Sequence, residues 1–420
     1  MKSQLCNISI IITSTILLGI LAIYLPFIIL ILLSITLIIN KNIRLLLVSV
    51  SLILSLSSFT INYNEYYPDV VRYYSDFNTN IYLALAKFKL YRFAIFLVMD
   101  SMNLYASFYS FITLFLFFYF LLKGCYNYLI CINYELNTIK RIIVFLFIIL
   151  AGVPFTIYFS FENLLGIVIF NYALSLYCLK KTKQFFIFSI IAILAHSSII
   201  ILLALMLVSV LIDKKIIKKT SAAIGLIILF ITINFLLNFE VKVGIEFLDS
   251  LFNKAYRYGN NEWSTLTRSE LLHYIPYVIL KLFLAISMTL ALLKNSKYKN
   301  INPLLYFIIV YSLTILLFVY NRMFSIRFGW SISLISFTVA YIYIMNFKTQ
   351  NIKKIIALAC ICICLISIPN VFILSKLGNQ ITFQNSIPLF NSINDINREI
   401  KIPNRKILNK IEQKTLNERE

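Results

Sequence analysis

Two arginines flank a short turn that is predicted between two apolar runs of the sequence. They are Arg322 and Arg327, in the stretch Asn321-Arg322-Met323-Phe324-Ser325-Ile326-Arg327-Phe328. A guanidinium presents a planar fork of N–H donors that matches phosphate oxygens, and it keeps its charge at any physiological pH. The pattern therefore predicts an anion-binding site. A simple hydrated turn is the alternative interpretation.

A second group of charged residues lies in a tyrosine-rich stretch. Asp69, Arg72 and Asp76 are spaced i, i+3 and i+7, which places them on one face of a helix. The neighbouring Tyr73 and Tyr74 suit a membrane-interface belt, but such a belt does not account for the charges. We interpret the charged face as a functional site, with a solvated, salt-bridged turn as the alternative.

Several motifs of nucleotide and metal chemistry are missing from the sequence. We find no Walker-type phosphate loop, no Gly-x-Gly-x-x-Gly, no His-Glu-x-x-His and no Asp-x-Asp. The tract Cys360-x-Cys362-x-Cys364 lies in an apolar run with no histidine nearby, and we interpret it as small apolar filler. The sequence therefore predicts neither a cofactor nor a metal site.

The composition indicates the class of protein that must position these residues. Of 420 residues, 60% are hydrophobic and only 13% are charged, whereas globular proteins carry about 25% charged residues. Disordered chains are poor in large apolar residues, yet this chain holds 36 phenylalanines. The composition predicts an all-α, polytopic membrane protein.

Apolar runs long enough to cross a bilayer define about 12–13 spans. They are Ile8–Tyr24, Pro26–Ile39, Ile43–Ile61, Leu104–Leu122, Ile142–Phe159, Asn163–Leu179, Phe185–Ala195, Ser197–Ile212, Ser221–Leu237, Leu271–Leu293, Pro303–Tyr320, Phe328–Asn346 and Ile355–Leu374. The first is expected to be an uncleaved anchor. We expect a membrane domain over residues 1–374, with outer loops at 62–103 and 238–270, and a polar tail over 375–420.

The net charge of +21 suits either a nucleic-acid partner or a topology signal. With the N-terminus inside, the cytoplasmic loops hold 19 basic and two acidic residues, whereas the outer side and the spans hold 11 and 10. This asymmetry is what the positive-inside rule predicts. We therefore expect no nucleic acid and an outer tail, and we look for the chemistry on the near-neutral outer side.

One pair of spans depends on a break in the chain. Residues 185–212 form one long and mostly apolar run, but both flanks are strongly basic, with Lys180 and Lys181 before the run and Lys214 and Lys215 after it. Both flanks should then be cytoplasmic. The run is predicted to be two short helices that turn at Ala195-His196-Ser197-Ser198, which places His196 near the outer face.

The order of these segments resembles that of the EpsG-like, Wzy-type bacterial O-antigen and exopolysaccharide polymerases. Pro68-Asp69-x-x-Arg72-Tyr73 looks like that family's first acidic external loop. Lys183-Gln184-Phe185-Phe186 followed by Ala195-His196-Ser197-Ser198 looks like its Lys-x-x-Phe…Ala-x-x-x-His-x-Ser region, and Arg327-Phe328 is similar to its late Arg-aromatic pair. The family often has an arginine near the start of the helix before the Lys-x-x-Phe segment, where this chain reads Ser160-Phe161-Glu162-Asn163-Leu164-Leu165.

The resemblance implies a glycosyltransferase-C-like enzyme of the bacterial inner membrane, with its active face periplasmic or extracellular. It implies a glycan held on undecaprenyl diphosphate, membrane lipid, a chain-length regulator and a flippase as partners. Asp69 or His196 would be the catalytic base, Arg72, Arg322 and Arg327 would stabilise the departing diphosphate, and Tyr73 and Tyr74 would stack on sugar rings.

Two other functions stay open at this point. A lipid-linked oligosaccharide flippase should carry charges inside the membrane, and Lys281 in the middle of a predicted span is one such charge. An O-antigen ligase is also a multi-span enzyme with external histidine and arginine, and it differs from a polymerase in its product.

Overall fold

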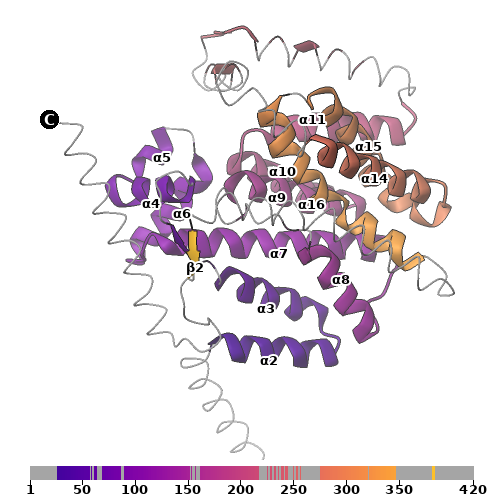
Figure 1. Cartoon of the computed structure of the whole chain (residues 1–420), viewed down its shortest axis with the longest axis horizontal. Coiled ribbons are helices and arrows are strands. Elements are labelled where there is room, and N and C mark those ends of the chain that lie inside the picture. The colour runs from indigo at the N-terminus through magenta and orange to yellow at the C-terminus, as the bar shows by residue number, and fades with distance from the viewer. Residues whose placement is uncertain are drawn as a thin grey trace, which may run out of the picture.

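The computed structural model describes residues 26–56, 58, 61–63, 69–86, 89–151, 153, 157, 161–216, 275–319, 321–346 and 381–383, with scattered positions between 225 and 256 (Figure 1). The predicted spans Ile8–Tyr24 and Ile355–Leu374 lie outside these residues. So do the Cys360–Cys364 tract, most of the predicted outer loop at 238–270 and most of the tail.

Almost all of the described chain is helical. The helices are α2 (Pro26–Ile39), α3 (Ile43–Leu56), α4 (Asp69–Thr79), α5 (Tyr82–Ala86), α6 (Leu90–Ser101), α7 (Ser107–Cys131), α8 (Ile139–Ala151), α9 (Phe161–Cys178), α10 (Thr182–Ala195), α11 (Ile199–Asp213), α14 (Ile275–Leu293), the 3-10 helix η4 (Ser296–Ile301), α15 (Asn302–Leu317) and α16 (Arg322–Asn346). Strands β1 (Ile61–Tyr63) and β2 (Ile381–Phe383) form one antiparallel pair. The predicted all-α class is confirmed apart from this short ladder.

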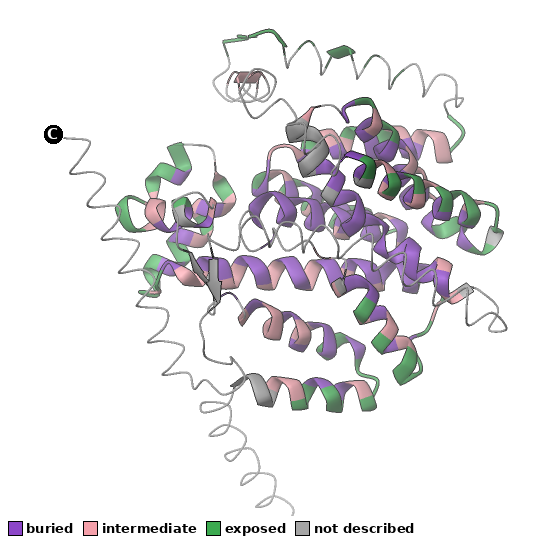
Figure 2. Ribbon diagram, viewed as in Figure 1, coloured by how far each residue is buried: buried purple, intermediate pink, exposed green. Residues whose placement is uncertain are grey.

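Within the part of the chain that the structure describes, three helical segments are long and apolar enough to cross a membrane: Ser107–Cys131, Phe161–Cys178 and Lys297–Leu317, the last formed by most of η4 together with α15. In the most apolar 18-residue stretch of each helix, 83% of α9 is buried inside the molecule, against 56% of α7. The helix α9 is therefore the central one. It packs on α7 and α10 along its length and also touches α11, α15 and α16 (Figure 2).

The contact between α7 and α9 depends on a glycine. A Cβ at Gly124 would lie 3.3 Å from the backbone Cα of Tyr172, which is tighter than most real contacts of this kind. The absence of a side chain at this position lets the two helices approach closely. The rings of Phe120, Tyr172 and Phe188 pack together one turn away, with centroids 4.9–5.6 Å apart.

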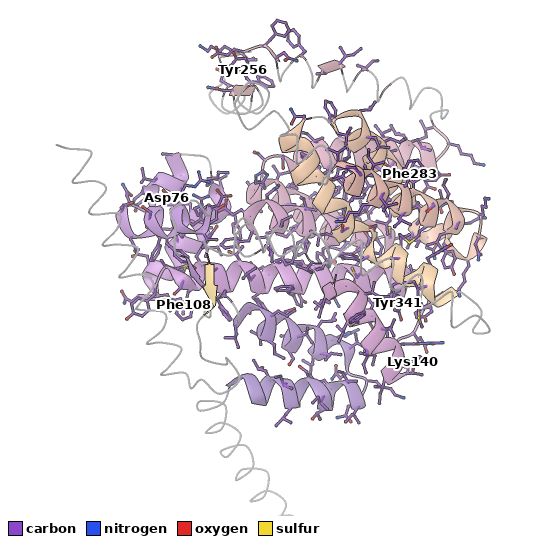
Figure 3. All side chains as sticks on the ribbon, viewed as in Figure 1. Asp76, Phe108, Lys140, Tyr256, Phe283 and Tyr341 are labelled. Carbon is purple, nitrogen blue, oxygen red and sulfur yellow. The ribbon has the colours of Figure 1, made fainter. Side chains whose placement is uncertain are left out.

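The basic loops that the sequence assigns to the cytoplasm share one end of the molecule. Asp213, beside Lys214, accepts from Asn302 Nδ2 at 3.1 Å, and Arg141 O accepts from Tyr341 Oη at 3.3 Å. At the same end, Asn300 Nδ2 donates to Cys131 O at 2.9 Å, where α7 ends. We call this the basic end. Lys140 and Tyr341 lie there, whereas Asp76 and Phe108 lie at the opposite end, which we call the α4 end (Figure 3).

The predicted break at His196 is confirmed. The helix α10 ends at Ala195 and α11 begins at Ile199, with His196 in extended backbone at φ −156° and ψ 118°. Asp213, at the end of α11, accepts from Asn302 Nδ2 at 3.1 Å, close to Asn300 at the basic end, and Ser175 in the last turn of α9 accepts from Asn127 Nδ2 of α7 at 2.9 Å. The helix α10 starts just after Cys178, at the basic end. The chain therefore leaves this end along α10 and returns to it along α11, as the basic flanks require.

The boundaries of several predicted spans were wrong, since α3 ends at Leu56, α8 ends at Ala151 and α7 continues past Leu122. The span Leu104–Leu122 was expected to end before Lys123, but α7 continues for two further turns to Cys131. Its last turns pack against α9 through Tyr128, whose hydroxyl donates to Asn171 O at 3.0 Å. Tertiary packing therefore extends the helix past the lysine that the sequence suggested as its end.

A left-handed residue at the end of α11 gives a stability prediction. Lys215 has φ +55°, whereas its neighbour Lys214 has φ −74°. Glycine adopts positive φ without the steric cost that a Cβ carries. Lys215→Gly is therefore expected to raise the free energy of unfolding by up to about 1 kcal/mol, and Lys214→Gly to lower it by about as much. Thermal unfolding in detergent micelles tests both, and a lower midpoint for Lys215→Gly would contradict the assignment.

Candidate functional site

A buried ionic cluster joins four helices at the α4 end. Arg92 of α6 donates from Nε to Glu162 Oε1 at 2.7 Å and from Nη2 to Glu162 Oε2 at 2.9 Å. Its Nη1 donates to Asp76 Oδ2 at 2.7 Å. The three side chains are only 4–13% exposed. We call Asp76, Arg92, Glu162 and Tyr109 the Arg92 cluster.

Aromatic side chains enclose this cluster. The guanidinium of Arg92 lies 4.0 Å from the ring centroid of Tyr73, and Tyr109 Oη donates to Glu162 Oε1 at 2.6 Å. The ring of Phe161 packs on both tyrosines. Burial by itself lowers the pKa of Arg92, but the hydrogen bonds and the charge of Glu162 outweigh it and hold the pKa above its ordinary value. Arg92 is therefore a permanent cation.

The bonding of Arg92 defines what the cluster can do. Its guanidinium is bidentate to one carboxylate, bonded to a second and stacked on a ring. Few donors remain for a ligand. Because Asp76 is on α4, Tyr109 on α7 and Glu162 at the start of α9, the cluster anchors the α4 end of the molecule to its central helices.

The hydroxyl of Tyr109 is expected to contribute measurably to this anchor. Tyr109→Phe removes a hydrogen bond to a charged acceptor, a change that costs about 1.5–3 kcal/mol. The control is Tyr91→Phe, since the hydroxyl of Tyr91 lies 3.0 Å from the neutral Oγ1 of Thr113 and should contribute about 0.5–1.5 kcal/mol. Unfolding in mixed micelles compares the two, and an equal loss would argue against a charged acceptor.

The segment with Asp69, Arg72 and Asp76 is helical and forms α4, but these three charged residues have different partners. Asp69 and Arg72 form an ion pair with each other, whereas Asp76 bonds Arg92. The side chain of Arg72 is 58% exposed and that of Asp69 is 23% exposed. The first turn of α4 therefore presents a carboxylate and a guanidinium to the surface, and its last turns hold the helix in place.

The structure places both tyrosines of this segment in the interior. Tyr73 is buried against Arg92, and Tyr74 is buried with its hydroxyl 2.5 Å from Ser110 Oγ. Burial raises the pKa of Tyr74, although the bond to Ser110 opposes this, so the hydroxyl keeps its proton. The two rings pack α4 onto α7 and leave little surface on which a sugar could stack.

His196 lies at the turn between α10 and α11 and packs against α9. Its side chain is 8% exposed, and its Nδ1 is 2.7 Å from Ser198 Oγ. A Cβ at Gly166 would lie only 3.0 Å from His196 Cβ, so this glycine of α9 lets the turn approach. The missing side chain at position 166 therefore allows His196 to pack directly against α9.

The predicted position of Arg322 and Arg327 in a turn was wrong. The turn between α15 and α16 covers only Phe318–Asn321, and α16 begins at Arg322. Both arginines therefore lie in the first two turns of a helix. Residues five apart are separated by about 140° around a helix, so the two positions do not share a face.

Three segments far apart in the sequence contact α9, two of them in its first turns and the third near its middle. Glu162 holds α4 through the Arg92 cluster, and Gly166, one turn further on, contacts His196. Near the middle of α9, Asn171 Nδ2 donates to Leu334 O of α16 at 3.5 Å. Arg327 of α16 and Leu164 of α9 each lie seven residues before this contact.

The two helices run in the same direction, because both end at the basic end. There Tyr341 of α16 donates to Arg141 O, and Ser175 in the last turn of α9 accepts from Asn127 Nδ2, near the end of α7. Arg327, in the second turn of α16, therefore lies in the half of that helix that is away from the basic end.

Sequence reasoning missed Arg92, Glu162 and Tyr109 as a unit. The available signal was Glu162, a lone acid at the start of an apolar run, because a buried charge of this kind requires a partner. The start of α9 has no arginine of its own, but Arg92 of α6 supplies a guanidinium there. Among the residues that the structure describes, no three His, Cys, Asp or Glu side chains are grouped to hold a metal ion.

Compared with protein-family models, with curated proteins and with solved structures, the chain shows no match. The resemblance to the EpsG-like, Wzy-type polymerases therefore rests on the order of its motifs and stays a prediction.

Proposed function

We propose that the protein is a polytopic, glycosyltransferase-C-like enzyme of the bacterial inner membrane that polymerises undecaprenyl-diphosphate-linked oligosaccharide repeat units into O-antigen, capsule or exopolysaccharide. One observation carries the proposal. The segments with Asp69 and Arg72 and with His196 come from distant parts of the sequence, and both pack against the first turns of α9. The helix that carries Arg327 packs against the middle of α9 and ends at the basic end. The first turns of α9 lie away from the basic end, which suits a site on the outer face.

The proposed reaction transfers a glycan from one lipid to another. A hydroxyl of the acceptor unit attacks the anomeric carbon of the donor glycan, and its proton passes to Asp69 or His196. The bond from the anomeric carbon to the diphosphate oxygen breaks, and that oxygen keeps the electron pair. A nearby cation stabilises the leaving diphosphate. The donor is already activated, so the step requires no nucleotide.

Among the arginines at the α4 end, Arg72 is the best placed to meet a phosphate, because its side chain is 58% exposed. Arg327 is the second candidate, and Arg322 the third. Arg92 has another role in this scheme. Its donors are engaged by Glu162 and Asp76, so it positions α4 and does not contact the substrate.

Complementation of a deletion strain tests the proposal. Cells that carry Asp69→Asn, His196→Ala or Arg327→Ala are compared on gels of surface glycan, with Asp100→Asn on the exposed face of α6 as the control. Loss of a base lowers rates by about 10²–10⁴-fold. At normal protein levels, we expect single repeat units in place of the long-chain ladder.

Other outcomes would assign the protein differently. Loss of even the single units from the surface lipid would indicate a flippase. Polymer that forms but does not reach the lipid core would indicate a ligase. An unchanged ladder in all three variants would refute the assigned site.

A further inference from the structure

An asparagine in the first turn of α9 is buried, and its amide oxygen accepts no hydrogen bond. Asn163 is only 9% exposed. Among the residues that the structure describes, the buried side-chain atoms without a hydrogen-bond partner are the hydroxyl oxygens of Ser58, Ser107, Ser189, Ser312 and Thr338 and the Oδ1 atom of Asn163. A hydroxyl can rotate toward another partner, whereas an amide oxygen can only accept. The oxygen of Asn163 therefore requires a donor from outside the described part of the chain.

A buried acceptor of this kind is costly to keep. Burial removes the amide oxygen from water, and without a donor nothing replaces the hydrogen bond that is lost. Nearly all buried polar groups in proteins have a partner for this reason, and the exceptions include functional sites and the sites of ordered waters. Leucine has the same branched shape as asparagine and would occupy the position without this cost. An asparagine here points to a ligand that donates.

The side of α9 that carries Asn163 faces the turn between α10 and α11 and the helix α15. Asn163 lies three residues before Gly166 and seven before Phe170, so the three positions share one side of the helix. Gly166 contacts the turn at His196, and Phe170 packs on Phe307 of α15 with ring centroids 5.5 Å apart. Helical side chains lean toward the N-terminus of their helix. The amide therefore lies one turn beyond the contact with His196, away from the basic end.

The charges near Asn163 define the class of ligand. From Asn163 to Ile167, α9 carries no charged residue, and the carboxylate of the preceding Glu162 is bonded to Arg92. A cationic ligand would find no free counter-charge on this part of α9, and a buried charge requires one. An uncharged donor fits this environment. The hydroxyl groups of a sugar and the N–H of an acetamido group are donors of this kind.

We propose that Asn163 is a substrate-binding residue, and that its Oδ1 accepts a hydrogen bond from a hydroxyl or an acetamido N–H of the glycan. The inference rests on the proposed function, which supplies the glycan. In that reaction Asn163 transfers no proton. It holds a sugar within one helical turn of the contact between α9 and His196.

Asn163→Leu tests the inference in the complemented deletion strain and in the purified full chain. A sugar donor left without its acceptor should lower the amount of long-chain glycan by about 5- to 150-fold. The midpoint of unfolding in mixed micelles should stay the same or rise, because the variant removes an unpaired polar group. A residue with a structural role alone would lower the midpoint. Asn163→Ala provides the same test if leucine prevents folding.

The matched controls remove other buried hydroxyls that have no partner. They are Ser189→Ala on α10 and Ser312→Ala on α15. Both should keep the long-chain ladder, and neither should lower the unfolding midpoint. Loss of the ladder in these controls as well would show that any change in the buried polar groups impairs the protein, and would overturn the role of Asn163.

Two further outcomes would overturn the inference. An unchanged ladder in Asn163→Leu would show that water alone satisfies the amide. A lower midpoint in both Asn163→Leu and Asn163→Ala would make the residue a structural one. If Asp69→Asn and His196→Ala lose the ladder while Asn163→Leu keeps it, this inference fails and the proposed function stands. An unchanged ladder in all three variants would refute both.

Discussion

Arg92→Met is expected to lower the free energy of unfolding by about 3–5 kcal/mol, because it leaves two buried carboxylates without their cation. The carboxylates are Glu162 and Asp76, whose side chains are 4% and 13% exposed. Methionine is apolar and of similar length, so the change removes the charge and leaves most of the volume. The measurement is unfolding in mixed micelles of a mild detergent and sodium dodecyl sulfate.

The control for Arg92→Met is Arg72→Met on the neighbouring helix. Arg72 pairs with Asp69, but its side chain is 58% exposed, and an exposed ion pair contributes about 0–1 kcal/mol. The double variant Arg92→Met/Glu162→Leu should recover much of the loss, because replacing a buried ion pair by apolar side chains is often nearly neutral. If Arg92→Met and Arg72→Met unfold at the same proportion of sodium dodecyl sulfate, the Arg92 cluster does not anchor α4.

Activity measured on the same variants distinguishes a residue that positions α4 from a residue that contacts the substrate. The Arg92 cluster fastens α4 to α7 and α9 through Asp76, and the first turn of α4 carries Asp69 and Arg72. A stable double variant that had lost the glycan ladder would show that the charged bonds set the position of α4. In contrast, Arg72→Met should spare stability and lower activity alone.

Local patterns in the sequence predicted part of this arrangement. The basic flanks at Lys181 and Lys214 determined the break at His196, and the spacing of Asp69 and Arg72 predicted a helix that carries both. Each inference needed only residues close together in the chain. Helical periodicity and the placement of charge around apolar runs contain this information.

Other features depend on contacts between distant residues, and the sequence did not reveal them. Arg92 and Glu162 are 70 residues apart, and each has the ordinary appearance of a charge beside an apolar run. Arg322 and Arg327 suggested a hydrated turn, but arginine is a good helix former, and α16 begins at the first of them. Packing partners decided the first case, and local helix propensity accounts for the second.

The glycine at the contact between α9 and the α10–α11 turn gives the second large effect. A Cβ at position 166 would lie 3.0 Å from His196 Cβ, 3.1 Å from Ile199 Cγ1 and 3.3 Å from the carbonyl oxygen of Ala192. The Cβ of His196 and the carbonyl oxygen of Ala192 cannot move aside by a change of rotamer. Gly166→Ala is therefore expected to lower the free energy of unfolding by about 1–3 kcal/mol, despite the helix propensity that alanine gains.

The matched control is Gly225→Ala, a helical position with no other atom within 4 Å of the new Cβ. Without a clash, alanine should stabilise the helix by up to about 1 kcal/mol, so the two variants should shift the unfolding midpoint in opposite directions. Because Gly166→Ala pushes the turn away from α9, the proposed function predicts that it lowers glycan polymerisation, as expected for His196→Ala. If both glycine variants were stabilised, His196 would not be packed against α9, and the proposed site would lose that residue.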